Sequence, residues 1–454
     1  MILLRQLFKS KRGSTIVIIS YVFLALISMI IIAIGIARSR TVQSWSEVSG
    51  KLWGKAILSE YDKYLLHDYG IMAFQSNDID VVKRLNVYSK YSFEDKLRVS
   101  LGTPSANLDQ YRMSDLNNFR KSIRDSLLYE SAKSVLDGSN RNVRSDVKNL
   151  NVSIDESKNT TAESKDKSVY GKRIIGNKYV IETLPSRGEK NNFNIKRISG
   201  MISNNNASDK LSSKALGKIS EMAFIVNKFN SHLKTCSDKE TFFANEYEYI
   251  VKGNLDDNKN FESCKKSIFL IRNALNLAAL SKDPEKMELI AAVSEVISPG
   301  PGAIVIQGII MESWAALEAR EDVKALLDNK RIPFIKKKGE WKVSLESVLG
   351  DEKFSEKIDE ESRKIMNENS EQLKEMSKTE SFVENMSGQN YEEYLLLMML
   401  TTPKDLRTRR IMDLIQINMK YRYYDDFNFD EYNCGVRFNL KINGKSYEVD
   451  DSYK

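Results

Sequence analysis

Three glutamates stand in surroundings that could make them functional carboxylates. Glu246, Glu248 and Glu312 lie among apolar or aromatic neighbours in the sequence. Hydrolases use pairs of carboxyl groups as general acid and general base. The chain has 62 acidic residues, so such pairs arise by chance in many places. We therefore assign no catalytic residue and expect the protein not to be an enzyme.

The chain contains only two histidines and three cysteines. His67 and His232 are far apart and neither adjoins a Cys-x-x-Cys pair, so we expect surface or interface histidines. Cys236 and Cys264 each adjoin a predicted helical segment and are candidates for a disulfide, which leaves Cys434 over. We expect no metal site and no bound cofactor.

Sequence motifs for common enzyme classes are absent. No P-loop, HExxH, GxSxG or dinucleotide-binding fingerprint occurs in the chain. The glycine-rich segment Ser298-Pro-Gly-Pro-Gly302 lacks the Lys and Ser/Thr that a P-loop requires. We interpret this segment as a helix breaker.

The first element that must position any site is an apolar run near the N-terminus. Residues 14–37 contain no charge, and as a helix they extend about 36 Å, enough to cross a hydrocarbon core of about 30 Å. A cleaved signal peptide is the alternative, but its apolar core has only about 7–15 residues and ends at a small-residue cleavage site. Here Arg38-Ser-Arg40 follows the run. The sequence favours a retained single-span anchor.

Charge predicts the orientation of this anchor. Four basic residues precede the span and two, Arg38 and Arg40, follow it; the preceding four are Arg5, Lys9, Lys11 and Arg12. The positive-inside rule therefore predicts a cytoplasmic N-terminus and an extracytoplasmic remainder in the cell membrane. These six charges account for most of the net charge of +7, so we expect no nucleic-acid partner.

Beyond the span, residues 38–70 are predicted to continue as an amphipathic helix. Apolar residues recur there at intervals of three and four, at Val42, Trp45, Val48, Leu52, Ala56 and Ile57, and Gly70 marks a helix end. A transmembrane helix that runs into an amphipathic half is typical of pilin-type subunits. A stalk that lifts a domain off the membrane has the same pattern, and periodicity does not separate the two.

We predict a mainly α fold with a helical ectodomain and a small C-terminal antiparallel β-hairpin or sheet. Val436, Phe438 and Leu440 alternate with polar residues before Asn443-Gly444, which is typical of a type I′ hairpin turn. The expected divisions are a cytoplasmic segment 1–13, the span 14–37, the amphipathic helix 38–70, a first ectodomain part 71–138, a polar flexible insertion 139–192, a helical core 193–345, and charged helix, buried helices and hairpin in 346–454.

One further apolar stretch, Ala303 to Leu317, has two interpretations. It is a candidate second membrane span, but it has only fifteen residues and contains Gln307 and Glu312. These features favour a core helix.

Several segments spread over most of the chain carry a resemblance. They are Lys11-Arg-Gly-Ser-Thr15, Ala37-Arg38, Glu60-Tyr-Asp-Lys-Tyr-Leu-Leu-His-Asp-Tyr-Gly70, Glu246-Tyr-Glu-Tyr-Ile-Val-Lys-Gly253, Leu270-Ile-Arg-Asn-Ala-Leu-Asn-Leu277, Trp314-Ala-Ala-Leu317 and Asp413-Leu-Ile-Gln-Ile-Asn418. The chain resembles an uncharacterised single-span membrane family of Gram-positive bacteria that is associated with tight-adherence (Tad) pilus clusters and is TadE/TadG-like at its N-terminus. The resemblance implies a surface protein encoded with a pilus or secretion apparatus.

One departure from this pattern affects processing. Pilin-like precursors have a basic leader, a Gly and an apolar helix with Glu five residues after the cleavage point, whereas the fifth residue after Gly13 is Ile18. We therefore expect an unprocessed membrane-resident component that supports assembly or anchoring of a Tad-like pilus or a related secretion machine. Its expected partners are the lipid bilayer and other pilus or secretion-system membrane proteins. An extracytoplasmic sensor and a cell-wall-acting enzyme are the alternatives.

Overall fold

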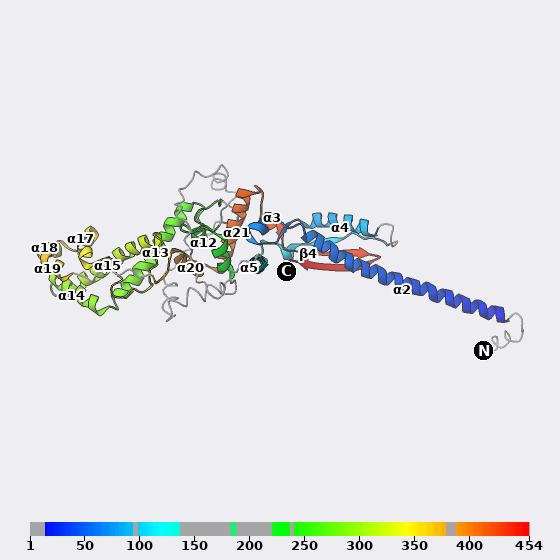
Figure 1. The fold of residues 1–454 in the computed structure, drawn as a ribbon, viewed down its shortest axis with the longest axis horizontal. Helices are drawn as coiled ribbons and strands as arrows, with labels where there is room; N and C mark the ends of the chain where they lie inside the picture. Colours follow the sequence, from blue (N-terminus) through cyan, green and yellow to red (C-terminus); the bar gives the residue numbers. More distant parts are fainter. Residues whose placement is uncertain are drawn as a thin grey trace. The chain divides into compact units, whose positions relative to one another are not determined.

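A computed structural model describes residues 14–93, 99–136, 183–187, 220–236, 240–377 and 387–453. The described chain is mainly helical, with a long apolar N-terminal helix and a small antiparallel sheet near the C-terminus (Figure 1). The predicted fold class is thereby confirmed. The chain divides into two compact units: unit 1 comprises Met1–Leu66, Met72–Asn118 and Asp430–Lys454, and unit 2 comprises His67–Ile71 and Phe119–Phe429.

Unit 1 combines segments from both ends of the sequence. Three strands form an antiparallel sheet in the order β2–β4–β5, and β1 pairs with β3. The elements are α2 (Ser14–Leu58), α3 (Lys63–Tyr69), which crosses into unit 2, β1 (Phe74–Gln75), α4 (Asp78–Phe93), β2 (Ser105–Asn107), the 3-10 turn η1 (Asp109–Tyr111), the 3-10 turn η2 (Phe429–Glu431), β3 (Tyr432–Asn433), β4 (Gly435–Ile442) and β5 (Lys445–Ser452).

The predicted hairpin is confirmed as β4 and β5. Asn443 and Gly444 have φ values of 50° and 76°, and positive φ at both central residues defines the type I′ turn. Ile442 pairs with Lys445 on either side of the turn. Val436, Phe438 and Leu440 are buried, as their alternation predicts.

Helix α2 is unbroken from Ser14 to Leu58 and ends earlier than the expected boundary at residue 70. The carboxylate of Asp62 accepts hydrogen bonds from the backbone N–H groups of Tyr64 and Leu65, both at 2.9 Å, and so starts the separate helix α3. Gly50 does not interrupt α2, and its lack of a side chain allows β5 to pack close to the helix. A Cβ at this position would lie 2.7 Å from Cγ2 of Val449 in β5.

The described part of unit 2 is mainly helical, with an isolated antiparallel bridge between Ile332 and Gln389. Its helices are the larger part of α5 (Leu116–Leu136), α11 (Ser220–Lys228), α12 (Glu246–Lys252), α13 (Asp257–Leu280), α14 (Pro284–Ile297), α15 (Gly302–Leu327), α16 (Leu345–Leu349), α17 (Glu352–Lys357), α18 (Glu360–Glu368), α19 (Ser370–Met376), α20 (Tyr391–Thr401) and α21 (Lys404–Arg422). Helix α14 begins at Asp283-Pro284, because the Asp283 side chain accepts from the backbone N–H of Lys286 and Pro284 occupies the first turn.

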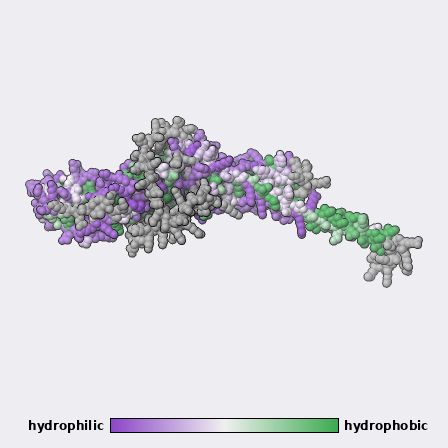
Figure 2. Space-filling model, viewed as in Figure 1, coloured by the Kyte–Doolittle hydropathy of each residue, from purple (hydrophilic) through white to green (hydrophobic). Residues whose placement is uncertain are grey.

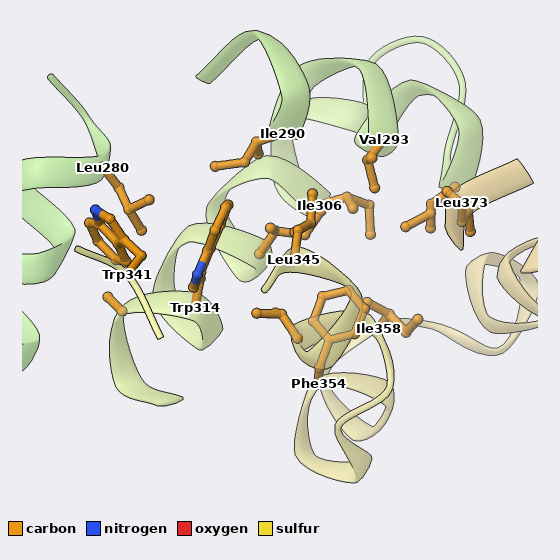
Figure 3. Packing of buried hydrophobic residues seen from close by; sticks show 14 of the residues in the cluster. Leu280, Ile290, Val293, Ile306, Trp314, Trp341, Leu345, Phe354, Ile358 and Leu373 are labelled. Carbon is orange, nitrogen blue, oxygen red and sulfur yellow. The ribbon is translucent and has the colours of Figure 1, made fainter. Parts of the chain in front are cut away.

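Helix α15 packs as a core helix of unit 2. By length and by a mean hydropathy of 1.2 it could also cross a membrane, but 44% of its most apolar stretch is buried inside the protein. Figure 3 shows Trp314 and Ile306 of α15 packed among residues of α14 and α16, with Trp341 beside Trp314. The centroids of the two indole rings are 5.9 Å apart. This packing favours the core-helix interpretation over a second span.

Candidate functional site

The first half of α2 presents a continuous apolar surface. Large hydrophobic side chains between Ile16 and Ile36 are exposed along it, and Figure 2 shows this half of the helix as an uninterrupted hydrophobic rod. Its most apolar stretch has a mean hydropathy of 2.9, and none of it is buried. Such a surface requires a cover other than water. By length and composition the helix can cross a membrane, and a signal sequence has the same features.

The second half of α2 is bound to the sheet of unit 1 through one face. Val42, Trp53 and Ile57 are buried in a hydrophobic cluster that includes residues of β4 and β5. The ring of Trp53 meets the edge of Phe93 of α4, with centroids 6.1 Å apart. This face fixes the helix to a folded body immediately after its apolar half.

The opposite face of the same segment is exposed. Trp45, Val48 and Leu52 have relative exposures of 47%, 63% and 64%. The sequence pattern placed these residues on one apolar face together with Val42 and Ile57. In the structure they lie on two separate faces. The prediction missed this because apolar spacing along a helix does not distinguish one wide apolar stripe from two narrow ones.

The candidate carboxylates Glu246 and Glu248 both lie in α12 and are fully buried. Glu246 accepts hydrogen bonds from the backbone N–H of Asn230 and from Nδ2 of Asn418, each at 2.7 Å. Oε1 of Glu248 accepts from the Tyr391 hydroxyl at 2.9 Å and from the backbone N–H of His232 at 3.1 Å.

A third buried carboxylate, Glu392 of α20, accepts from the Ser231 hydroxyl at 3.0 Å. We call Glu246, Glu248 and Glu392 the α12 cluster. The direct donors to all three are amides or hydroxyls, so the hydrogen bonds carry no compensating positive charge.

Burial dominates the electrostatics of the α12 cluster. It raises the pKa of Glu246 to about 7 and that of Glu248 to about 8, against the smaller opposing effect of their hydrogen bonds. Burial also raises the pKa of Glu392 above its usual value. Oε2 of Glu248 is buried without a hydrogen-bond partner among the described residues, which suits a protonated carboxyl group. The cluster can hold protons near neutral pH, but its carboxyl groups are closed to a substrate.

The other chemistry-bearing residues named from the sequence lie apart from this cluster. Glu312 is exposed on α15, with Oε2 3.4 Å from Nζ of Lys357. His67 is exposed beside Asp68, and the ring of His232, which is also exposed, stacks on Phe261 with centroids 4.0 Å apart. The structure thus brings together only Glu246 and Glu248 of the three candidate carboxylates.

The structure does not join the candidate pair Cys236 and Cys264 by a disulfide. Both residues have free thiols. Sγ of Cys236 donates to the carbonyl of Val226 at 3.3 Å, and Sγ of Cys264 lies 4.0 Å from the carbonyl of Glu248. The two sulfur atoms therefore contact different backbone carbonyls and not each other.

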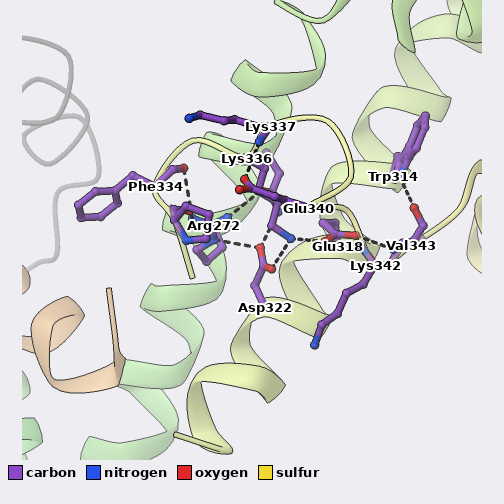
Figure 4. Close-up of polar contacts among 12 residues, drawn as sticks. Arg272, Trp314, Glu318, Asp322, Phe334, Lys336, Lys337, Glu340, Lys342 and Val343 are labelled. Atoms are coloured by element: carbon purple, nitrogen blue, oxygen red, sulfur yellow. Dashed lines mark hydrogen bonds and ion pairs between the residues drawn. The ribbon is translucent and has the colours of Figure 1, made fainter. Parts of the chain in front are cut away.

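A second buried cluster, which the sequence analysis did not identify, joins α13 and α15 (Figure 4). We call Arg272, Glu318, Asp322 and Lys336 the Asp322 cluster. Oδ2 of Asp322 lies 2.9 Å from Nε of Arg272, and Oδ1 lies 2.6 Å from Nζ of Lys336. Lys336 also pairs with Glu318. The four side chains are buried and their formal charges cancel.

The Asp322 cluster fastens the segment between α15 and α16. Nη1 of Arg272 donates to the carbonyl of Pro333 at 2.8 Å, and Glu318 accepts from the backbone N–H groups of Lys342 and Val343 at 3.0 and 2.8 Å. Burial alone would raise the pKa of Asp322, but Arg272 and Lys336 hold it below its usual value. The sequence held one signal for this cluster: Glu318 and Asp322 are charged residues within the largely apolar helix α15.

Two groups of residues remain outside these sites. Among the described residues, no set of three or more His, Cys, Asp or Glu side chains is arranged to hold a metal ion. The residues expected to set the membrane topology, namely Arg5, Lys9, Lys11 and Arg12, lie outside the described residues, as do Gly13 and most of the expected insertion 139–192.

Comparison with known proteins assigns the chain to a family. A family profile matches residues 133–444, more than half of the chain and most of unit 2. Helix α2 precedes the matched segment. No curated protein and no solved structure matches the chain. The protein therefore belongs to the family of unknown function DUF5702.

Proposed function

We propose that the protein is a membrane-anchored surface protein that supports assembly or anchoring of a Tad-like pilus or a related secretion machine through protein–protein contacts. The observation that carries this proposal is the division of α2 into an exposed apolar half and a half bound to a folded sheet. Helix α2 runs without a break through Ala37 and Arg38 into its sheet-bound half, as expected of an anchor that stays attached to the folded part of the chain.

The proposed topology places the N-terminus in the cytoplasm and residues 41–454 outside. It rests on the four basic residues before the span and on the positive-inside rule. Protease added to intact, wall-stripped cells should remove a C-terminal tag from the full chain. Complete protection of the tag, with the same tag cleaved after cell lysis, would contradict this topology.

The link to a pilus rests on the sequence resemblance and on the pilin-like combination of a span with a sheet-bound helix. Glu246 and Glu248 lend no support to a cell-wall-acting enzyme, since both carboxyl groups are buried. In a strain with matching pilus genes, deletion of this gene should reduce surface fibres counted by electron microscopy. The full chain should restore them, whereas a secreted form with a cleavable signal in place of residues 1–37 should not. Equal restoration by both forms would refute an anchoring role.

Processing at Gly13 separates a membrane-resident component from a fibre subunit. Cleavage would create a charged amine in apolar surroundings, and Ile18 offers no carboxylate to pair with it. We therefore expect the mature chain to retain Arg5, Lys9, Lys11 and Arg12. N-terminal peptide mapping of protein extracted from membranes with active prepilin peptidase tests this expectation. A mature chain that starts at Ser14 would identify a fibre subunit instead.

A further inference from the structure

The exposed face of α2 beyond the apolar half carries a second, separate apolar surface. We call Trp45, Val48 and Leu52 the outer stripe. Their intervals of three and four residues place them on one side of the helix, opposite the side that packs on β4 and β5. Anchors at positions i, i+3 and i+7 are the pattern by which one helix binds an apolar surface of another protein.

Lipid does not reach most of this stripe. Leu52 comes 16 residues after Ile36, where the exposed apolar half ends, and 16 residues of helix extend about 24 Å. The headgroup layer adds only about 5–8 Å on each side of the hydrocarbon core. A cover for Val48 and Leu52 must therefore come from protein.

The stripe continues the same straight helix that would cross the membrane, and this continuity selects the kind of cover. A helix that leaves the bilayer next to α2 would run alongside it and meet Trp45, Val48 and Leu52 in turn. Such a partner needs no extra ordering of a loop, because its own span already holds it parallel to α2.

Charge at the edge of the stripe decides between a second copy and another protein. Lys51 and Lys55 are exposed, and each follows a member of the stripe by three residues. The acidic Glu47 accepts a hydrogen bond from Gln43 at 3.1 Å, on the side away from the stripe. Two copies anchored in one membrane must be parallel, so Lys51 and Lys55 of one copy would lie beside the opposite flank of the other copy's stripe. That flank carries uncharged residues such as Ala56, so a second copy offers no acidic partner to the two lysines.

We propose that the outer stripe binds a helix of a different membrane protein, which emerges from the same bilayer and presents acidic residues to Lys51 and Lys55. This inference rests on the proposed membrane anchoring and specifies the chemistry of one partner. Apolar contact with Trp45, Val48 and Leu52 would supply the affinity, and the two lysines would select an acidic helix in preference to a second copy.

The test uses the full chain in its native membrane with a photo-crosslinking amino acid at Val48. The matched control carries the same group at Gln43, which is exposed on the other side of α2. Crosslinked peptides are identified by mass spectrometry. We expect a peptide from another protein that directly follows an apolar span and contains Asp or Glu. Reversing both charges with Lys51→Glu and Lys55→Glu should lower the yield by about tenfold, whereas Lys51→Arg and Lys55→Arg should preserve it.

Other outcomes would overturn the inference. These are a crosslink between two copies of this chain, adducts with lipid alone, or a yield at Val48 no higher than at Gln43. A carbonate wash of the same membranes separates this failure from failure of the proposed function. A chain that stays in the membrane without the expected crosslink refutes only the outer-stripe partner, whereas a chain released by the wash refutes the anchoring and the inference with it.

Discussion

Unit 2 buries two clusters of acidic side chains that differ in the charge of their partners. In the Asp322 cluster, Asp322 and Glu318 are paired with Arg272 and Lys336. In the α12 cluster, Glu246, Glu248 and Glu392 receive hydrogen bonds from neutral donors. Equal burial therefore has opposite consequences: the pKa of Asp322 is lowered, whereas the pKa values of Glu246 and Glu248 are raised. The identity of the partner, rather than burial, decides whether a carboxyl group stays ionised.

This contrast predicts opposite responses to pH. A lowered pKa contributes stability that is lost on acidification below the usual value of 3.8 for Asp322. A raised pKa contributes stability that is present in acid and lost as pH rises toward the folded value. Unit 2 should thus be most stable in weak acid, between the two regimes.

The largest expected effect is that of Asp322→Ala. This substitution leaves Arg272 without its carboxylate and Lys336 with Glu318 alone, and breaking a buried ion pair from one side costs about 3–5 kcal/mol. Urea unfolding of the full chain in detergent, followed by tryptophan fluorescence to which Trp314 and Trp341 contribute, measures the loss.

The matched control for Asp322→Ala is Glu312→Ala on the same helix. The ion pair of Glu312 with Lys357 is exposed, so its loss should cost less than about 1 kcal/mol. If both substitutions destabilise the chain equally, the charge balance of the Asp322 cluster does not matter for folding.

A smaller effect, which depends on pH, is expected for Glu248→Gln. The folded chain binds the proton of this carboxyl group with a pKa of about 8 and the unfolded chain with the ordinary value of 4.5. Between these values the folded state holds more protons, so the free energy of unfolding falls as pH rises, by about 1.4 kcal/mol per pH unit for this group. Glu248→Gln should remove this slope and make the chain more stable than wild type at pH 8.

The experiment compares urea unfolding at several pH values from 5 to 8 for the wild type, Glu248→Gln and the exposed control Glu312→Gln. Gln suits position 248 because both donors, the Tyr391 hydroxyl and the His232 N–H, address one oxygen. A wild-type profile that is flat over this range would mean that the α12 cluster is not protonated in the folded chain.

The smallest expected effect concerns the thiols beside the α12 cluster. Because Cys236 and Cys264 are free, dithiothreitol should leave the Tm of the chain unchanged. A fall of about 5 °C or more on reduction would show a stabilising disulfide, since removal of a native disulfide costs about 2–5 kcal/mol. Thermal unfolding with and without the reductant measures this directly.

The features that the sequence predicted are local ones. Asn443-Gly444 carries its conformation in its own chemistry, as a turn with positive φ at both residues. The apolar run of α2 likewise needs no distant residue for its recognition.

The features that the sequence did not predict depend on contacts between distant segments. Strand β2, within a stretch expected to be helical, pairs with β4 near the other end of the chain, as Ser105 does with Asn439. The ion pair of Arg272 with Asp322 and Lys336 joins three elements, and no spacing in the sequence links them. Hydrophobic periodicity alone also left open which face of α2 meets the sheet.

The packing of Gly50 against Val449 has a consequence for biosynthesis. The residues that cover the inner face of α2 are made almost four hundred positions after it. At about 5–20 residues per second, the ribosome needs about 20–80 s to supply them. During that time Val42 and Ile57 lack their neighbours in β4 and β5, and the chain of unit 2 is completed before these strands are made. A nascent chain released before β4 and β5 would expose this apolar face and be recognised by chaperones and quality-control proteases.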